Sequence, residues 1–276
     1  MTKIKVSAVQ YSYKPINNFE DFASNVETLV DQAKGSDFVV FPETFTMQLH
    51  YITPNNDMNK IHEYTDQYLK LFEPLSKKYN IYIIAGSHLT RENNKIYNRC
   101  YVFCPDGALL THDKTHLFPI EVPFVTPGDK FEVFETEKVK FAISTCYEME
   151  FPEVGRILML KGAEVIFCPS YTVGEHGFWR VRHCAQARAI ENQIYTVHSC
   201  MVGSPIFQGM DGYGRSSILS PCEPPWPLNG IIAEARTNEE MVITGELDLK
   251  LLHRKRKRGA ALNLKFLRPE LYDIKY

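Results

Sequence analysis

Three residues of complementary chemistry each follow an apolar stretch of the sequence: Glu43 after FVVFP, Lys114 after LLTHD and Cys146 after KFAIST. A cysteine thiolate attacks a carbonyl or nitrile carbon. A glutamate takes the thiol proton, returns it to a leaving amine and then activates water against the thioester. A lysine ammonium stabilises the tetrahedral oxyanion beside the backbone N–H of Tyr147. These side chains together predict hydrolysis through a thioester, with no serine or metal required.

Each of these residues also has a purely structural interpretation. Glu43 follows a proline, and carboxylates are common in the first turn of a helix. Lysines such as Lys114 usually lie on the surface, and a free cysteine such as Cys146 is often part of the packed core. The placement of all three at strand ends favours the catalytic interpretation, because ligand sites of open α/β sheets lie just beyond the carboxyl ends of strands.

The elements that must position these residues are strands alternating with amphipathic helices. Strand patterns occur at 4–10, 38–41, 81–85, 96–103, 108–112, 138–145, 165–169 and 194–200, with shorter ones at 212–219, 230–235 and 241–247. Helical spacing occurs at 18–34, 61–80, 152–161 and 178–192, and residues 44–60 are expected to form a polar loop. Pro105-Asp106-Gly107 marks a hairpin turn. This alternation predicts one α/β domain over residues 1–276, with mixed sheets.

Composition narrows the class of protein. The chain has 276 residues, 44% of them hydrophobic and 23% charged, and its net charge is −2. That charge does not attract nucleic acid or a membrane surface. Seven cysteines without a CxxC pair, no secretory leader and no membrane-length apolar run predict a soluble protein in the reducing cytoplasm. No cofactor is expected.

Two groups of polar residues are expected not to form binding sites. The basic run 253–258 (HRKRKR) is expected to be a solvated face or an interface and not a nucleic-acid site, because no aromatic platform flanks it. His112 and His116 have a ligand-like spacing around Lys114, but no third ligand lies nearby in the sequence, so no metal is expected.

The ordered motifs resemble the nitrilase superfamily of carbon–nitrogen hydrolases along essentially the whole chain. Beyond the three strand ends, they are Lys114-Thr115-His116-Leu117, Cys146-Tyr147-Glu148, Pro127-Gly128-Asp129, Phe151-Pro152-Glu153, residues 187–192 (ARAIEN) and residues 268–272 (RPELY). The resemblance implies a Glu43–Lys114–Cys146 triad in a four-layer α-β-β-α sandwich. It also implies a homodimer or larger homo-oligomer, with the tail from about residue 250 packing on the domain or on a partner subunit.

The resemblance also implies a second glutamate between the lysine and the Pro-Gly-Asp motif. Glu121 is the only acidic residue between Lys114 and Asp129, and it is therefore expected to position Lys114 or the substrate amide. Glu150 stands where many amidases of the family have an arginine, which alters the charge expected in the pocket. Tyr147 stands where members that hydrolyse nitriles usually have a tryptophan, which favours amides.

The substrate expected from this resemblance is a small carboxamide, cleaved to a carboxylate and ammonia. An N-carbamoyl amine or amino-acid hydrolase, a nitrilase, and a non-catalytic binding protein on the same fold remain alternatives. Substrate contacts are expected from Glu150 and from the residues around 170–183. The candidates there are Tyr171, Trp179 and His183, although packed aromatics are the more frequent case.

Overall fold

The computed structural model describes residues 3–205 and 209–272, which form two packed β-sheets. The first sheet has the order β12-β1-β2-β3-β4-β5, with bounds Met241–Asp248, Lys3–Ser12, Phe38–Val40, Tyr82–Glu92, Lys95–Phe103 and Leu109–Asp113. The second has the order β6-β7-β8-β9-β10-β11, with bounds Phe134–Glu135, Lys140–Ile143, Val165–Ser170, Tyr195–Val202, Ser217–Leu219 and Ile231–Glu234. A short parallel pairing between β1 and β9 joins the two sheets.

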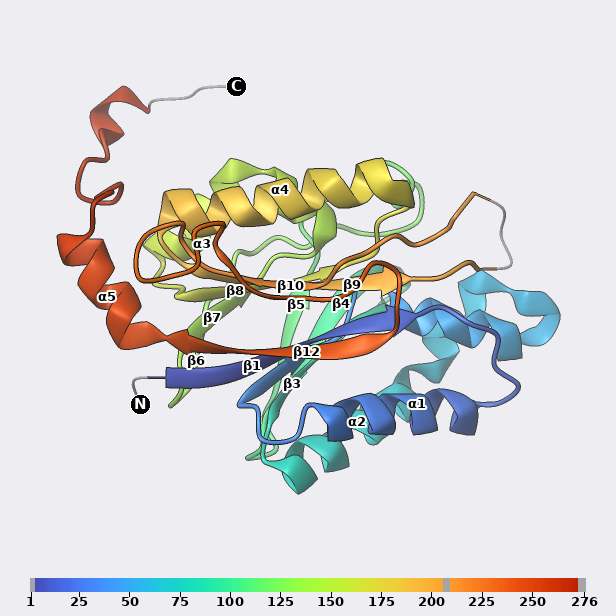
Figure 1. The fold of residues 1–276 in the computed structure, drawn as a ribbon. Helices are drawn as coiled ribbons and strands as arrows, with labels where there is room; N and C mark the ends of the chain where they lie inside the picture. Colours follow the sequence, from blue (N-terminus) through green and yellow to red (C-terminus); the bar gives the residue numbers. More distant parts are fainter. Residues whose placement is uncertain (1–2, 206–208, 273–276) are drawn as a thin grey trace.

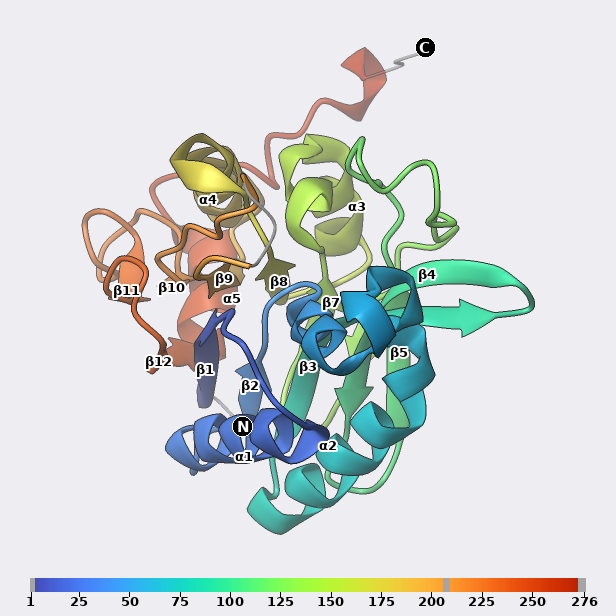
Figure 2. The same ribbon diagram turned by 90° about the vertical axis from the view of Figure 1, so that its right-hand side faces the viewer.

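The two sheets lie face to face around an apolar core. Strand residues alternate between faces, and each sheet directs one set of side chains inward. Phe38 of β2 contacts both Phe141 of β7 and Phe167 of β8, with ring centroids 5.4 Å apart in each pair. Figure 1 shows the sheets as two central layers, and Figure 2 shows the same layers after a 90° turn.

Helices cover the outer face of each sheet. Helices α1 (Phe19–Gln32) and α2 (Thr65–Tyr79) pack on the first sheet, and α3 (Pro152–Leu160) and α4 (Gly174–Asn192) pack on the second (Figure 1). The layer order is therefore α-β-β-α, which confirms the predicted fold class. Among the described residues, no helix is long and apolar enough to cross a membrane.

The structure corrects the expected loop at 44–60. Residues 45–52 and 58–64 form 3₁₀ helices, and α2 begins at Thr65, not near residue 61. Phe45 and Leu49 are fully buried, and the Phe45 ring lies 5.1 Å from that of Tyr11. The helical spacing of Phe45 and Leu49 is difficult to recognise in the sequence because polar residues lie between them.

Helix α4 begins four residues earlier than predicted, at Gly174. Gly174 and Gly177 lower the helix propensity of this first turn. Burial of Phe178 and Val181 one turn later favours the helix despite the two glycines.

The basic segment near the C-terminus begins with a helix, α5 (Leu249–Arg258). The Asp248 carboxylate caps it by accepting a hydrogen bond from Leu251 N at 2.7 Å, and Leu252 is fully buried. This part of the predicted tail packs on the domain. Just beyond α5 the chain still contacts the sandwich, because Gln193 Nε2 donates a hydrogen bond to Ala261 O at 2.7 Å and Leu264 packs against the core of the second sheet. The described residues after these contacts extend away from the sandwich (Figure 1), and residues 273–276 lie outside the described part.

Candidate active site

Glu43 lies just beyond the carboxyl end of β2 and is 4% exposed. Thr44 N donates a hydrogen bond to Ser87 Oγ at 2.9 Å, which ties this turn to β3. Gly86, at a register shift of β3, has φ +62°, and a Cβ atom there would lie 2.1 Å from Pro42 O. Glycine is therefore required at position 86 for the Pro42–Glu43 turn to lie against β3.

Lys114 follows β5 and is 2% exposed. Its backbone N donates to Asn98 O at 3.0 Å, and its carbonyl accepts a hydrogen bond from Gly128 N at 2.8 Å. A Cβ atom at Gly128 would lie 2.2 Å from Asp113 O. This close approach explains the glycine of the Pro-Gly-Asp motif, which closes the loop that carries Glu121.

Cys146 stands at the turn between β7 and a short 3₁₀ helix, η4 (Cys146–Glu150). Its φ of +47° is a left-handed conformation that costs a non-glycine residue about 1–2 kcal/mol. The thiol donates to Tyr171 O at 3.6 Å. The first backbone hydrogen bond of η4 is donated by Glu148 N, which leaves the Tyr147 N–H outside the helical ladder.

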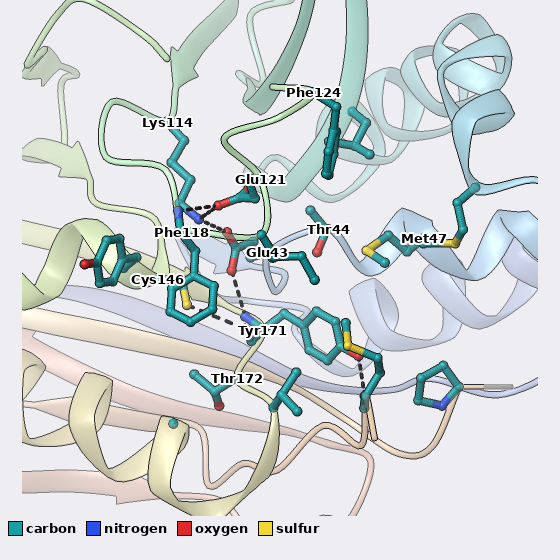
Figure 3. Close-up of a pocket in the computed structure, with 18 of the residues that line it drawn as sticks. Glu43, Thr44, Met47, Lys114, Phe118, Glu121, Phe124, Cys146, Tyr171 and Thr172 are labelled. Carbon is teal, nitrogen blue, oxygen red and sulfur yellow. Dashed lines mark hydrogen bonds and ion pairs between the residues drawn. The ribbon is translucent and has the colours of Figure 1, made fainter. Parts of the chain in front are cut away.

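These separate turns meet in one cluster (Figure 3). Lys114 Nζ donates to Glu43 Oε1 at 2.7 Å and to Glu121 Oε2 at 2.5 Å. Asn98 Nδ2 bridges the same two carboxylates, at 3.1 Å to Glu43 and 2.7 Å to Glu121. Tyr171 N donates to the other Glu43 oxygen at 3.0 Å. The structure thus brings the predicted glutamate and lysine together, with Glu121 as a second carboxylate on the same ammonium.

Burial and mutual attraction set the protonation of the cluster. Burial raises the pKa of Glu43, and Glu121 adds to this, although Lys114 opposes it. Burial alone would lower the pKa of Lys114, but Glu43, Cys146 and Glu121 outweigh it, so the pKa is raised. Burial and then Glu43 raise the pKa of the Cys146 thiol, against the pull of Lys114. The resting site therefore holds a neutral thiol beside a charged ammonium and a carboxylate of increased basicity.

A fully buried carboxylate, Glu148, connects the lysine turn to the cysteine turn. It accepts hydrogen bonds from Thr115 N at 2.7 Å, Thr115 Oγ1 at 2.6 Å and Thr145 N at 2.5 Å. His112 Nε2 donates to it at 2.9 Å. Burial alone would raise the pKa of Glu148, but His112 and Thr115 lower it to about 2. Conversely, Glu148 raises the pKa of His112 against the effect of burial.

Replacing Glu148 with glutamine is expected to destabilise the fold by on the order of 3 kcal/mol near pH 5.5. The Glu148 contribution is present above its ordinary pKa of 4.5 and is lost as the pH falls toward 2. The His112 contribution is present below 6.5 and is lost as the pH rises through its raised pKa. Urea unfolding from pH 2 to 8 measures this, and identical parent and variant profiles would contradict it. Exposed Glu246→Gln serves as the control.

The cluster opens into a cavity of about 640 Å³. Glu43, Lys114, Glu121 and Cys146 line one end of it. Of the predicted substrate-contact residues, Glu150 and Tyr171 line the cavity, and Tyr147, the predicted backbone donor to the oxyanion, lines it as well. Glu150 Oε1 lies 3.4 Å from Nε of Arg180, a residue of α4 that also borders the cavity.

Trp179 and His183 are not brought to this cavity. Their rings stack with centroids 5.3 Å apart and line a separate, more open hollow along α4. Gly177 and Val181 border the cavity from α4. Trp179 is two residues from each of them, a rotation of about 200° around the helix, and therefore faces elsewhere.

Sequence reasoning missed two residues that hold the cluster. Asn98 is 1% exposed and lies on β4, on the same inward face as Cys100 and Val102. The sequence did contain a signal for Asn98, because a polar amide stands there at a position of the strand where the alternation predicts an apolar, inward-facing residue. Glu148 stood out in the sequence only as part of the Cys146-Tyr147-Glu148 motif, because its contacts with Thr115 and His112 come from a distant segment. Within residues 3–205 and 209–272, no group of three or more metal-binding side chains is assembled.

Comparison with known proteins places this geometry in a family. A family model described as carbon–nitrogen hydrolase matches residues 5–257. The probable hydrolase YhcX of Bacillus subtilis is 44% identical over 283 residues, which cover 99% of this chain and 55% of that protein. The chain therefore spans only about half the length of this relative. Omega-amidase NIT2-A of Xenopus laevis is 32% identical over 270 residues, or 91% of each protein.

Solved structures agree with the sandwich architecture. Saccharomyces cerevisiae Nit3, a member of branch 10 of the nitrilase superfamily, matches with a TM-score of 0.77 and 27% identity, over 93% of this chain and 94% of that chain. A carbon–nitrogen hydrolase from Helicobacter pylori matches with a TM-score of 0.82 and 21% identity, over 99% and 97% of the two chains, and supports the fold alone. These matches confirm the predicted resemblance.

Proposed function

We propose that this chain, which belongs to the carbon–nitrogen hydrolase family, is a cysteine-dependent amidase that converts a carboxamide to a carboxylate and ammonia. One observation carries the proposal. A buried ammonium, Lys114, is held by the carboxylates of Glu43 and Glu121 at the end of a cavity that also exposes the Cys146 thiol. Binding alone has no need of a nucleophile, a base and a cation in one desolvated place.

The first half of the proposed reaction forms the thioester. The Cys146 sulfur attacks the amide carbon while its proton passes to Glu43. The raised pKa of Glu43 suits it to accept this proton near neutral pH. The Lys114 ammonium and the Tyr147 N–H receive the oxyanion. Collapse of the tetrahedral intermediate breaks the carbon–nitrogen bond, and Glu43 returns the proton to the leaving ammonia.

The second half of the reaction hydrolyses the thioester. Glu43, again a carboxylate, takes a proton from a water molecule that attacks the thioester carbon. The same donors hold the second oxyanion, and the Cys146 sulfur leaves and recovers the proton from Glu43. Each water consumed gives one carboxylic acid and one ammonia, and in solution the acid passes its proton to the ammonia to give a carboxylate and an ammonium ion.

Glu121 is proposed to position Lys114. Its carboxylate also accepts a hydrogen bond from Phe118 N at 2.8 Å, which anchors the loop beside the ammonium. Glu121→Gln is expected to lower kcat by about 10–10²-fold with a smaller effect on KM, because the ammonium loses one of its two anchoring charges. Single-turnover acylation rates measure this. An unchanged rate would return Glu121 to a purely structural part in its loop.

The experiment that tests the activity is an ammonia-release screen over amides, N-carbamoyl compounds and nitriles. Parent protein and Cys146→Ala are assayed side by side. Release from amides by the parent alone is expected. Ammonia release only from N-carbamoyl compounds or nitriles would favour those reactions instead. If no class of compound released ammonia, a non-catalytic binding protein would be the remaining interpretation.

A homodimer or larger homo-oligomer is also proposed, assembled through the outer helices and the C-terminal segment. Leu160 at the end of α3 is 63% exposed, and Phe266 beyond α5 is 68% exposed. Deleting residues 259–276 is expected to shift the assembly toward a smaller species in light scattering. An unchanged mass would remove the segment from the interface. Location in the cytoplasm stays a prediction.

A further inference from the structure

The cavity reaches well beyond the space that a small amide needs. Its volume of about 640 Å³ lies within the range of pockets that enclose drug-sized ligands. The triad and Glu121 occupy only one end, where the carboxamide must lie. The remaining space is available to the acyl part of the substrate.

The walls of this space are apolar and come from several segments. Met47, Met58, Leu89, Ile96, Phe118 and Phe124 all line it. Phe118 is 40% exposed and Phe124 is 50% exposed, although both are large hydrophobic side chains on the Glu121 loop. Figure 3 shows Phe118 beside Cys146, and Phe124 and Met47 farther from it. Exposed apolar side chains that converge on a concave site favour an apolar ligand.

The described charges that line the cavity are already paired. Lys114 is held by Glu43 and Glu121. Arg180, the other guanidinium or ammonium group among these lining residues, lies 3.4 Å from the Glu150 carboxylate. The net formal charge of the five charged lining residues is −1, from three carboxylates (Glu43, Glu121 and Glu150), one ammonium (Lys114) and one guanidinium (Arg180). A substrate carboxylate in this space would meet an excess of negative charge and would compete with Glu150 for Arg180.

We propose that the site selects a primary amide whose acyl part is an uncharged, apolar arm of several carbons, which packs along the Phe118–Phe124 wall. This inference rests on the proposed amidase function and names its substrate class. Each methylene buried there adds favourable transfer free energy to the bound state. The Glu150 carboxylate beside Nε of Arg180 offsets the charge of this guanidinium and so disfavours an anionic arm.

The first test measures kcat/KM for linear primary amides from acetamide to hexanamide. A rise of about fourfold per methylene, or on the order of 10²-fold across the series, is expected. The second compares succinamic acid with 4-methylpentanamide, in which an isopropyl group replaces the carboxylate. A preference on the order of 10²-fold for the uncharged amide is expected, because the carboxylate loses its hydration without gaining a free cation.

A matched pair of variants tests whether the acyl arm of the substrate packs against the Phe118–Phe124 wall. Phe124→Ala is expected to lower kcat/KM for hexanamide about tenfold more than it lowers kcat/KM for acetamide. Val122→Ala, on the same loop and 61% exposed but outside the cavity lining, is expected to change neither. Retained acetamide turnover also shows that the variant is folded and that its triad is intact.

The outcomes separate the inference from the activity on which it rests. A preference for acetamide or succinamic acid would overturn the apolar arm and leave the amidase function standing. A rising series that Phe124→Ala does not flatten would overturn the assignment to this wall. Absence of ammonia from every amide tested would overturn both proposals.

Discussion

Replacing Cys146 with alanine is expected to lower ammonia release from a good amide by on the order of 10⁴-fold or more, because no other described side chain at the cavity end is a nucleophile of this kind. The change removes only a sulfur atom from a buried turn. The thermal unfolding midpoint is therefore expected to stay within a few degrees of the parent value. Coupled ammonia detection and thermal unfolding measure the two effects.

Cys104→Ala is the matched control for this prediction. Cys104 follows β4 and is 6% exposed, close to the 7% of Cys146, but it does not line the cavity. It is expected to keep most of the activity and to lose some stability through the small cavity left in the core. Turnover by the Cys146 variant at the parent rate would exclude the thioester mechanism.

Replacing Lys114 with methionine, which has a similar length, is expected to reduce the acylation rate by at least about 10²-fold through loss of the oxyanion cation. It is also expected to destabilise the fold by about 3–5 kcal/mol at pH 7, because the buried Glu43 and the partly buried Glu121 lose their shared partner. Stopped-flow acylation and urea unfolding measure the two consequences. Intact-mass detection of a normally accumulating acyl-enzyme would contradict the catalytic role.

The sign of the pH dependence in the Lys114 variant follows from Glu43. Without the ammonium, the pKa of Glu43 in the folded protein rises further, while its value in the unfolded chain stays ordinary. The folded state then binds more protons, so stability falls as the pH rises from about 4.5. The variant is expected to be more stable at pH 5 than at pH 7. Adding Glu43→Gln is expected to remove most of this difference.

The strand ends were the part of the site that the sequence could predict. Two apolar runs, Phe38–Val40 and the strand before Cys146, are each followed closely by polar residues. The carboxyl ends of such strands meet at one edge of a sheet, so the polar residues that follow them are expected to lie close together. Glu121 was found by a family rule and by being the sole acid in its loop. Arg188 and Glu191 of the 187–192 motif stand three residues apart, a spacing that predicts an ion pair on a helix, and on α4 their atoms lie 2.7 Å apart.

The other parts of the site could not be predicted, because they depend on distances in the folded protein that the spacing of residues along the sequence does not determine. Trp179 and His183 lie near Tyr171 in sequence, yet the helical rotation carries them out of the cavity. Asn98 contacts Glu121 only because the β4–β5 hairpin is folded, and the same hairpin brings His112 toward Glu148. The apolar cavity is lined by single residues from several separate segments, from the 3₁₀ helix at 45–52 to the Glu121 loop, and none of these segments is a recognisable motif.

The pairing of β1 with β12 has a consequence for how the protein is made. Lys3 lies opposite Asp248, and Gln10 opposite Met241, so β1 needs a strand that is synthesised much later to complete the hydrogen bonds of one edge. At about 5–20 residues per second, translation leaves one edge of β1 unpaired for on the order of ten seconds or more. Nascent chains are therefore expected to depend on cellular chaperones until synthesis of β12 is finished.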